Sequence, residues 1–208
     1  MDLREWIAND HAFVLARFSS AIVAHIPAEH WKANPGSDNA GTERPGSREG
    51  TASVDAPSIA WLLFHTTYHQ DLALNTAIRN HEPLLAGHRD RLGLGHVPPE
   101  AGLTEAEDRQ VTDALDLSQL DDYVRAVNAR TAEWIDNLST MALDSIPSSS
   151  YRLEHKAGIP ADGELSWLHA MWHGKAVSWL VQWECIGHGH AHVGEMVGIR
   201  NRLGFSPF

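Results

Sequence analysis

Residues 188–204 read HGHAHVGEMVGIRNRLG, and this stretch decides the fold. Three histidines at alternate positions would be typical of one face of a strand. The residues that follow favour a helix ending at Gly204, since glycine accepts the positive φ common at a helix C-terminus. On a helix, His188 and His192 lie one turn apart and point the same way, whereas His190 points elsewhere. The stretch therefore predicts a helix that carries half of a metal site.

Apolar periodicity predicts three more long helices. The first covers residues 3–27 and is stopped by Pro27. The second begins near Pro57 and Ser58 and reaches about residue 80, and the third covers roughly 118–138, with Ser118 as its N-cap. The fourth, which contains the opening stretch, takes residues 174–203.

The segments between these helices are long and rich in turn-forming residues. We expect two long connections, over residues 33–56 and 82–103. We expect a short helix over residues 104–114. We expect an irregular segment over 141–164 and a short helical entry over 165–172.

Four long helices without alternating strands predict an all-α protein, a four-helix bundle that forms one domain over residues 1–208. The first two connections are both long enough to cross a bundle, so the helix order stays open at this point.

The composition excludes several classes of protein. The net charge is −11, and no Lys/Arg cluster offers a surface for nucleic acid or an anionic membrane. No stretch is long and apolar enough for a membrane span, and the first residues lack the pattern of a signal peptide. The single Cys185 excludes an intramolecular disulfide and suits a reducing cytoplasm.

His65 lies on the most apolar predicted helix, between Leu62-Leu63-Phe64 and Leu72. A buried histidine needs a hydrogen-bond partner or a metal. Together with His188 and His192 it matches an open three-histidine metal site, and imidazole suits zinc, nickel, iron and copper alike.

Other residues compete for roles at this site: His69, Asp71, Cys185 and Glu195. Cys185 is better explained as a small apolar core residue. Glu195 can ligate, act as a base or orient a ligand, and Asp71 can do the same. The second helix lacks the Glu-x-x-His pattern of di-iron bundles, which favours a mononuclear site.

Two segments carry a resemblance to a known family: residues 58–65, SIAWLLFH, and the His188-x-x-x-His192 segment with Gly194, Glu195 and a terminal Leu-Gly. The chain resembles the DinB-like four-helix-bundle metalloproteins. This resemblance implies an up-down-down-up bundle and one divalent cation bound by His65, His188 and His192. Zinc or nickel is the expected metal, with iron as the next candidate. Gln70, Glu195 and the long 33–56 connection depart from the usual family pattern.

The resemblance also implies a function. The family includes transferases and isomerases that use mycothiol, bacillithiol or glutathione, so we expect an enzyme whose metal activates a low-molecular-weight thiol towards a small-molecule substrate. Glu195 and His69 are the candidate catalytic proton carriers. Alternatives are a hydrolase that activates water and a non-catalytic metal-binding stress-response bundle. Relatives often dimerise, which favours a homodimer.

Overall fold

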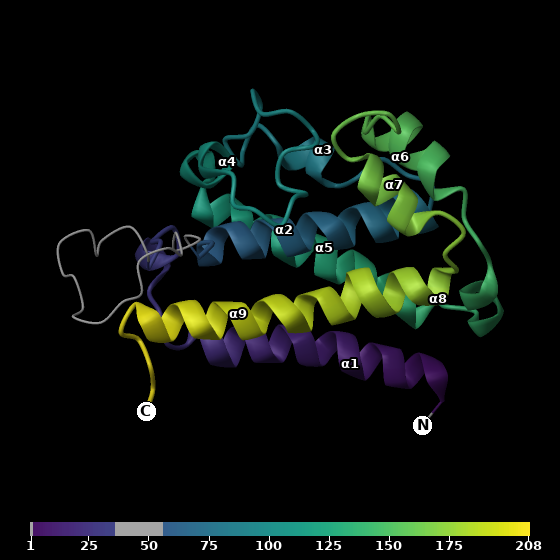
Figure 1. Cartoon of the computed structure of the whole chain (residues 1–208). Helices are drawn as coiled ribbons and strands as arrows, with labels where there is room; N and C mark the ends of the chain where they lie inside the picture. Colours follow the sequence, from purple (N-terminus) through teal and green to yellow (C-terminus); the bar gives the residue numbers. More distant parts are fainter. Residues whose placement is uncertain (1, 36–55) are drawn as a thin grey trace, which may run out of the picture.

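The structure is a computed structural model that describes residues 2–35 and 56–208, and every regular element in these two ranges is a helix (Figure 1). The predicted all-α class is confirmed. The predicted connection 33–56 lies almost entirely outside the described residues.

Each predicted long helix corresponds to one or more consecutive helical elements. These are α1 (Leu3–Phe18) with the π-helix η1 (Ser19–Val23), α2 (Ile59–Asp71) with the π-helix η4 (Leu72–Ile78), α5 (Leu117–Asp136), and α8 (Val177–Leu180) with the π-helix η6 (Val181–Gly187) and α9 (His188–Arg202). Shorter helices lie between them: η2 (Ala28–His30), α3 (Leu85–His88), α4 (Arg109–Ala114), η5 (Thr140–Asp144), α6 (Ser149–Ala157) and α7 (Ser166–Trp172).

Side-chain caps set where the long helices begin. Helix α2 begins close to the predicted start, and Ser58 is its N-cap, because its hydroxyl accepts a hydrogen bond from the Trp61 amide at 3.1 Å. Pro57 precedes the cap and is not in the first turn, where it was expected. The predicted Ser118 cap of α5 is wrong. Asp116 takes that role, since its carboxylate accepts from the amides of Ser118 and Gln119 at 2.9 and 3.1 Å, so the helix starts two residues earlier.

The expectation of an irregular segment over 141–164 is wrong in part, because α6 lies within it. Ser149 and Leu153 are the buried residues of this helix, so its apolar stripe is too short to stand out in the sequence. It ends at Gly158, whose φ of 69° suits a glycine.

Helix α2 is buried on all sides, and every residue in it except Thr66 is buried. It packs against α5 and α9, and α1 packs against the same two helices. A helix that is apolar all round belongs in the interior of a fold. The histidines of α2 are therefore held inside the protein, where their polar atoms must find partners.

Asp71, at the end of α2, fastens the following connection to the core. One carboxylate oxygen accepts from Asn75 Nδ2 at 2.8 Å and the Leu84 amide at 3.0 Å. The other accepts from the Leu85 amide at 2.9 Å and the Tyr123 hydroxyl at 2.8 Å. Both oxygens are occupied, so this acid serves the fold, and the alternative of Asp71 as a metal-site residue gains no support.

No helix within residues 2–35 and 56–208 has the length and apolarity that a membrane span requires.

Replacing Asp71 should test this anchor. We expect Asp71→Ala to lower the free energy of unfolding by about 3 kcal/mol, because it leaves several buried donors without an acceptor. Asp121→Ala is the control, since Asp121 is half-exposed and its ion pair with Arg125 lies at the surface, and it should cost less than about 1 kcal/mol. Urea denaturation followed by circular dichroism measures both. Equal losses would contradict the anchoring role.

Candidate metal centre

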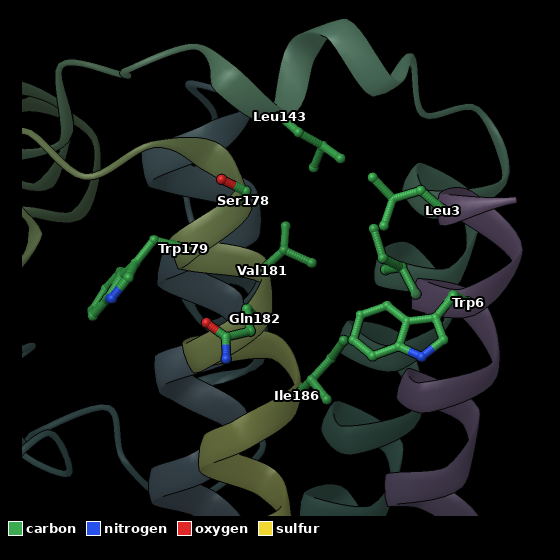
Figure 2. A pocket seen from close by; sticks show the side chains of 9 residues that line it. Leu3, Trp6, Leu143, Ser178, Trp179, Val181, Gln182 and Ile186 are labelled. Atoms are coloured by element: carbon green, nitrogen blue, oxygen red, sulfur yellow. The ribbon is translucent and has the colours of Figure 1, made fainter.

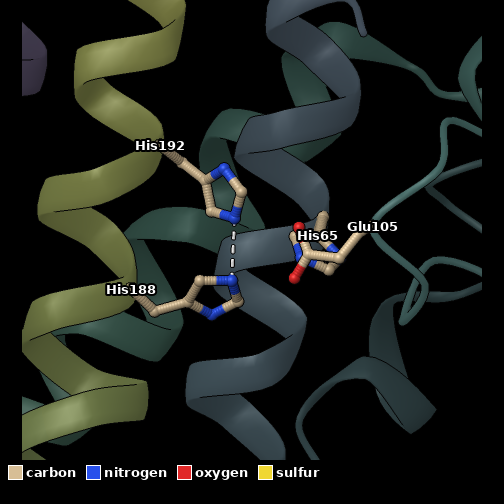
Figure 3. A group of neighbouring side chains, drawn as sticks. All are labelled: His65, Glu105, His188 and His192. Carbon is tan, nitrogen blue, oxygen red and sulfur yellow. Dashed lines mark hydrogen bonds between the residues drawn. The ribbon is translucent and has the colours of Figure 1, made fainter.

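The structure brings the three predicted metal ligands together. His65 from α2 and His188 and His192 from α9 lie with Glu105 so that one ligand atom of each falls within 4.8 Å of every other (Figure 3). We call the three histidines the triad. This cluster can hold a metal ion, and the assignment of each histidine as a ligand stays a prediction.

The tautomer of His65 leaves one ring nitrogen free for a ligand. Its Nδ1 donates to the Gly102 carbonyl at 2.8 Å, because a carbonyl can only accept. The neutral ring then carries its lone pair on Nε2, which is buried and has no hydrogen-bond partner among the described residues. Burial, reinforced by His69 and His188, lowers the pKa of His65 to about 2. A neutral imidazole is the form that binds a metal.

His192 presents the same pattern. Its Nδ1 donates to a carboxylate oxygen of Glu195 at 2.6 Å, so its Nε2 carries the lone pair. That Nε2 lies 2.7 Å from Nε2 of His188 (Figure 3). Two ring nitrogens at this distance repel unless a proton or a cation is shared between them. The triad therefore directs nitrogen lone pairs towards a common point.

The two predicted catalytic residues lie at different places. Glu195 is half-exposed and orients His192 through the hydrogen bond above, which is the carboxylate–histidine arrangement common beside metals. His69 lies outside the triad cluster and donates through Nε2 to the Leu103 carbonyl at 3.0 Å. Burial alone would lower the pKa of His69, but Glu184 raises it overall. Proton transfer by either residue stays a prediction.

Glu184 is a buried acid that the sequence analysis missed. Its Oε1 accepts from Trp172 Nε1 at 2.6 Å, and its Oε2 faces His69 Nδ1 at 3.3 Å and His188 Nδ1 at 3.6 Å. Burial would raise the pKa of this carboxyl, but His188 and His69 hold it at about 2. These three residues, His69, Glu184 and His188, form a second group with metal-ligand geometry, which we call the inner cluster. The spacing of Glu184 four residues before His188 was the available signal.

Glu105 was also missed, and no sequence pattern points to it. It lies in the segment between α3 and α4, is exposed, and reaches the triad from outside (Figure 3). Its position depends on how that segment crosses α2, which only the folded structure reveals.

The carbonyl that orients His65 requires a glycine. Gly102 has a φ of +97°, and a Cβ on it would lie 2.4 Å from Cε1 of Phe64. Both the backbone angle and the contact exclude a larger residue without movement. The orientation of His65 thus depends on a glycine that lies 37 positions away in the chain.

Cys185 belongs to neither cluster and is buried in the core. Burial raises the pKa of its thiol far above the usual range, so the thiol stays protonated. This agrees with its interpretation as a small apolar residue.

Two tryptophans border the clusters at the surface. The Trp183 ring stacks on His188 with centroids 6.0 Å apart, and the Trp167 ring lies 6.3 Å from that of His69. Both are partly exposed, at 42% and 39%. They offer flat apolar walls to a molecule that approaches this side of the site.

A cavity lies away from both clusters. It has a volume of about 360 Å³ and is lined by side chains of α1 and the α8–η6 segment, including Trp6, Trp179 and Ile186 (Figure 2). No member of the triad lines it, so this cavity is separate from the candidate metal centre.

Comparisons with known proteins define the fold without a function. No family model and no curated protein matches the chain. A crystal structure described as a conserved protein from Enterococcus faecalis is similar in fold, with a TM-score of 0.60 and 17% sequence identity. The match covers 98% of this chain and 99% of that one. The resemblance to DinB-like metalloproteins stays a prediction.

Gly102→Ala should weaken metal binding. The added methyl group displaces the carbonyl that orients His65, and we expect a loss of about 10–100-fold in metal affinity, as for other residues that orient ligands. Gly204→Ala is the control, because Gly204 also has a positive φ of 87° but has open space around its Cβ position. Competition with a chromogenic chelator measures both affinities, and an unchanged affinity in Gly102→Ala would count against the role of this carbonyl.

The lowered pKa of His65 predicts a pH dependence for the metal-free protein. The unfolded chain binds a proton at this ring below about pH 6.5 while the folded protein does not, so acid favours unfolding. The stability of the wild type relative to His65→Leu should fall by about 1 kcal/mol between pH 6 and pH 5. Denaturant titrations of both proteins measure this difference, and a constant difference would contradict the burial of a neutral ring.

Proposed function

We propose that this protein is a metal-dependent enzyme in which His65, His188 and His192 hold one divalent cation. The observation that carries the proposal is the convergence of three buried imidazoles, two of which are fixed through Nδ1 with Nε2 directed inward. Three imidazole ligands suit zinc or nickel best, and iron less well.

We propose that the reaction is the transfer or isomerisation of a substrate by a low-molecular-weight thiol such as mycothiol or bacillithiol. A cation at the triad would supply a Lewis acid that lowers the pKa of a bound thiol. The exposed Glu105 carboxylate, close to the ligand atoms, can accept the proton that the thiol loses. Trp167 and Trp183 can hold an apolar electrophile beside the thiolate.

The position of Glu105 also supports a second candidate function. A carboxylate beside a three-histidine metal can equally take a proton from a water molecule, which is the arrangement of a metal-dependent hydrolase. A non-catalytic metal-binding bundle is the alternative of another class. Its site would stay metal-loaded but would bind no thiol and turn over no substrate.

We also propose that the long helices form the predicted four-helix bundle in up-down-down-up order. The contacts of α1 with α5 and α9, and of α2 with the same two helices, support a closed ring of four. In Figure 1 the colours along the chain run one way through α1 and α9 and the opposite way through α2 and α5.

A homodimer in the cytoplasm completes the proposal. Helix α1 exposes Leu3, Trp6 and Phe13 by about half of each side chain, which supports burial against a second copy.

The metal assignment predicts a clear loss on mutation. The double variant His188→Ala/His192→Ala should lose the metal of the triad, because a single imidazole remains. His190→Ala is the matched control from the same helix, since His190 instead contacts Asp10 and Arg17, and it should keep full metal content. Inductively coupled plasma mass spectrometry of untreated protein measures both. Full metal content in the double variant would refute the assignment.

A screen of thiols against electrophilic substrates, with a parallel panel of hydrolase substrates, separates the candidate activities. We expect thiol-dependent turnover that requires metal and falls at least 10-fold in Glu105→Gln. Turnover of hydrolase substrates without thiol would replace the first function by the second.

A further inference from the structure

We propose that the inner cluster is a second cation site, formed by His69, Glu184 and His188 and sharing His188 with the triad. This inference extends the proposed metal centre, which on its own needs a single ion.

Three ligand atoms of the inner cluster lack partners. His69 Nδ1, Glu184 Oε2 and His188 Nδ1 are buried, and none has a hydrogen-bond partner in the described part of the chain. One ligand atom of each of the three residues lies within 4.8 Å of the others. A buried polar atom without a partner is costly, and three that converge on one point are unusual.

The other polar atoms of His69 and Glu184 already make hydrogen bonds, so the His69 ring and the Glu184 carboxylate are not free to rotate. His69 Nε2 donates to the Leu103 carbonyl, and Glu184 Oε1 accepts from Trp172 Nε1. The partnerless atoms are thus aimed at one another by hydrogen bonds on their far sides.

The separations fit a shared ion better than direct hydrogen bonds. Glu184 Oε2 lies 3.3 Å from His69 Nδ1 and 3.6 Å from His188 Nδ1. Charge-assisted hydrogen bonds between nitrogen and a carboxylate are about 2.7–2.9 Å long. Ligand atoms bound tetrahedrally at about 2.0–2.1 Å from a zinc-like cation lie about 3.3–3.4 Å apart.

The tautomer of His69 leads to the same conclusion. Because Nε2 carries the proton that is donated to Leu103, the neutral ring directs its Nδ1 lone pair at the Glu184 carboxylate. A proton or a cation held between them removes this repulsion. Two imidazoles and one carboxylate suit zinc and similar divalent ions, whereas magnesium and calcium prefer oxygen ligands alone.

Two negative charges lie at the shared residue and beside it when both sites are filled. His188 would then bind one ion through Nε2 and the other through Nδ1, and its ring proton passes to the solvent. The resulting imidazolate is shared by the two ions, and the Glu184 carboxylate offsets part of the charge of the second divalent cation. Since all three residues are buried, this ion would hold His188 in place for the triad and would not meet substrate.

Native mass spectrometry of the full chain, stripped with a chelator and reloaded with Zn²⁺, counts the ions directly. We expect two ions in the wild type, one in His69→Asn and one in Glu184→Gln. His169→Asn is the matched control and should keep two. His169 is equally buried, has Nε2 at 3.1 Å from the Ile159 carbonyl and a partnerless Nδ1, but belongs to neither cluster.

The outcomes separate this inference from the proposed function. One ion in the wild type that is lost in His65→Ala would overturn the second site and leave the metal centre intact, whereas no ion at all would overturn both. If the variants fail to fold, the wild type loaded with Cu²⁺ still decides the matter. Two copper ions joined by an imidazolate couple magnetically and lower the EPR intensity well below two spins, and an intensity of one isolated spin would refute the shared ligand.

Discussion

Two consecutive backbone carbonyls, those of Gly102 and Leu103, determine which ring nitrogens of the two α2 histidines are free. They accept hydrogen bonds from His65 and His69, which lie one turn apart on a helix buried on all sides. The first ring is held through Nδ1 and the second through Nε2, so the free nitrogens are Nε2 of His65 and Nδ1 of His69. This difference directs His65 to the triad and His69 to the inner cluster.

Much of the fold follows from patterns within single helices. The all-α class, the start of α2 at Ser58 and the gathering of His65 with the His-x-x-x-His pair of α9 can be predicted because apolar periodicity and one-turn spacing are local properties. The cap of α5 was misplaced because Asp116 and Ser118 are both good capping residues, and only the folded backbone selects between them.

The remainder of the site depends on contacts between distant segments. Glu184 has the right spacing to His188, but nothing in the sequence says that its carboxylate is buried beside His69. Glu105 and the Gly102 carbonyl reach α2 only because their segment crosses that helix. Short motifs thus predict the three ligands and Glu195 beside them, whereas the contacts of Gly102, Glu105 and Glu184 with the site come from tertiary packing.

The segment from Gly102 to Glu105 combines two tasks in four residues. Its carbonyls fix the histidines of α2, and its exposed acid reaches the triad from outside. Glu105 lies at the exposed side of the triad, so an ion that leaves on this side passes the segment, and moving the segment aside would also release both rings. Exchange of a bound ion would therefore be slow and cooperative, so that the lifetime of the loaded state is set by local backbone opening and not by the strength of any single ligand bond.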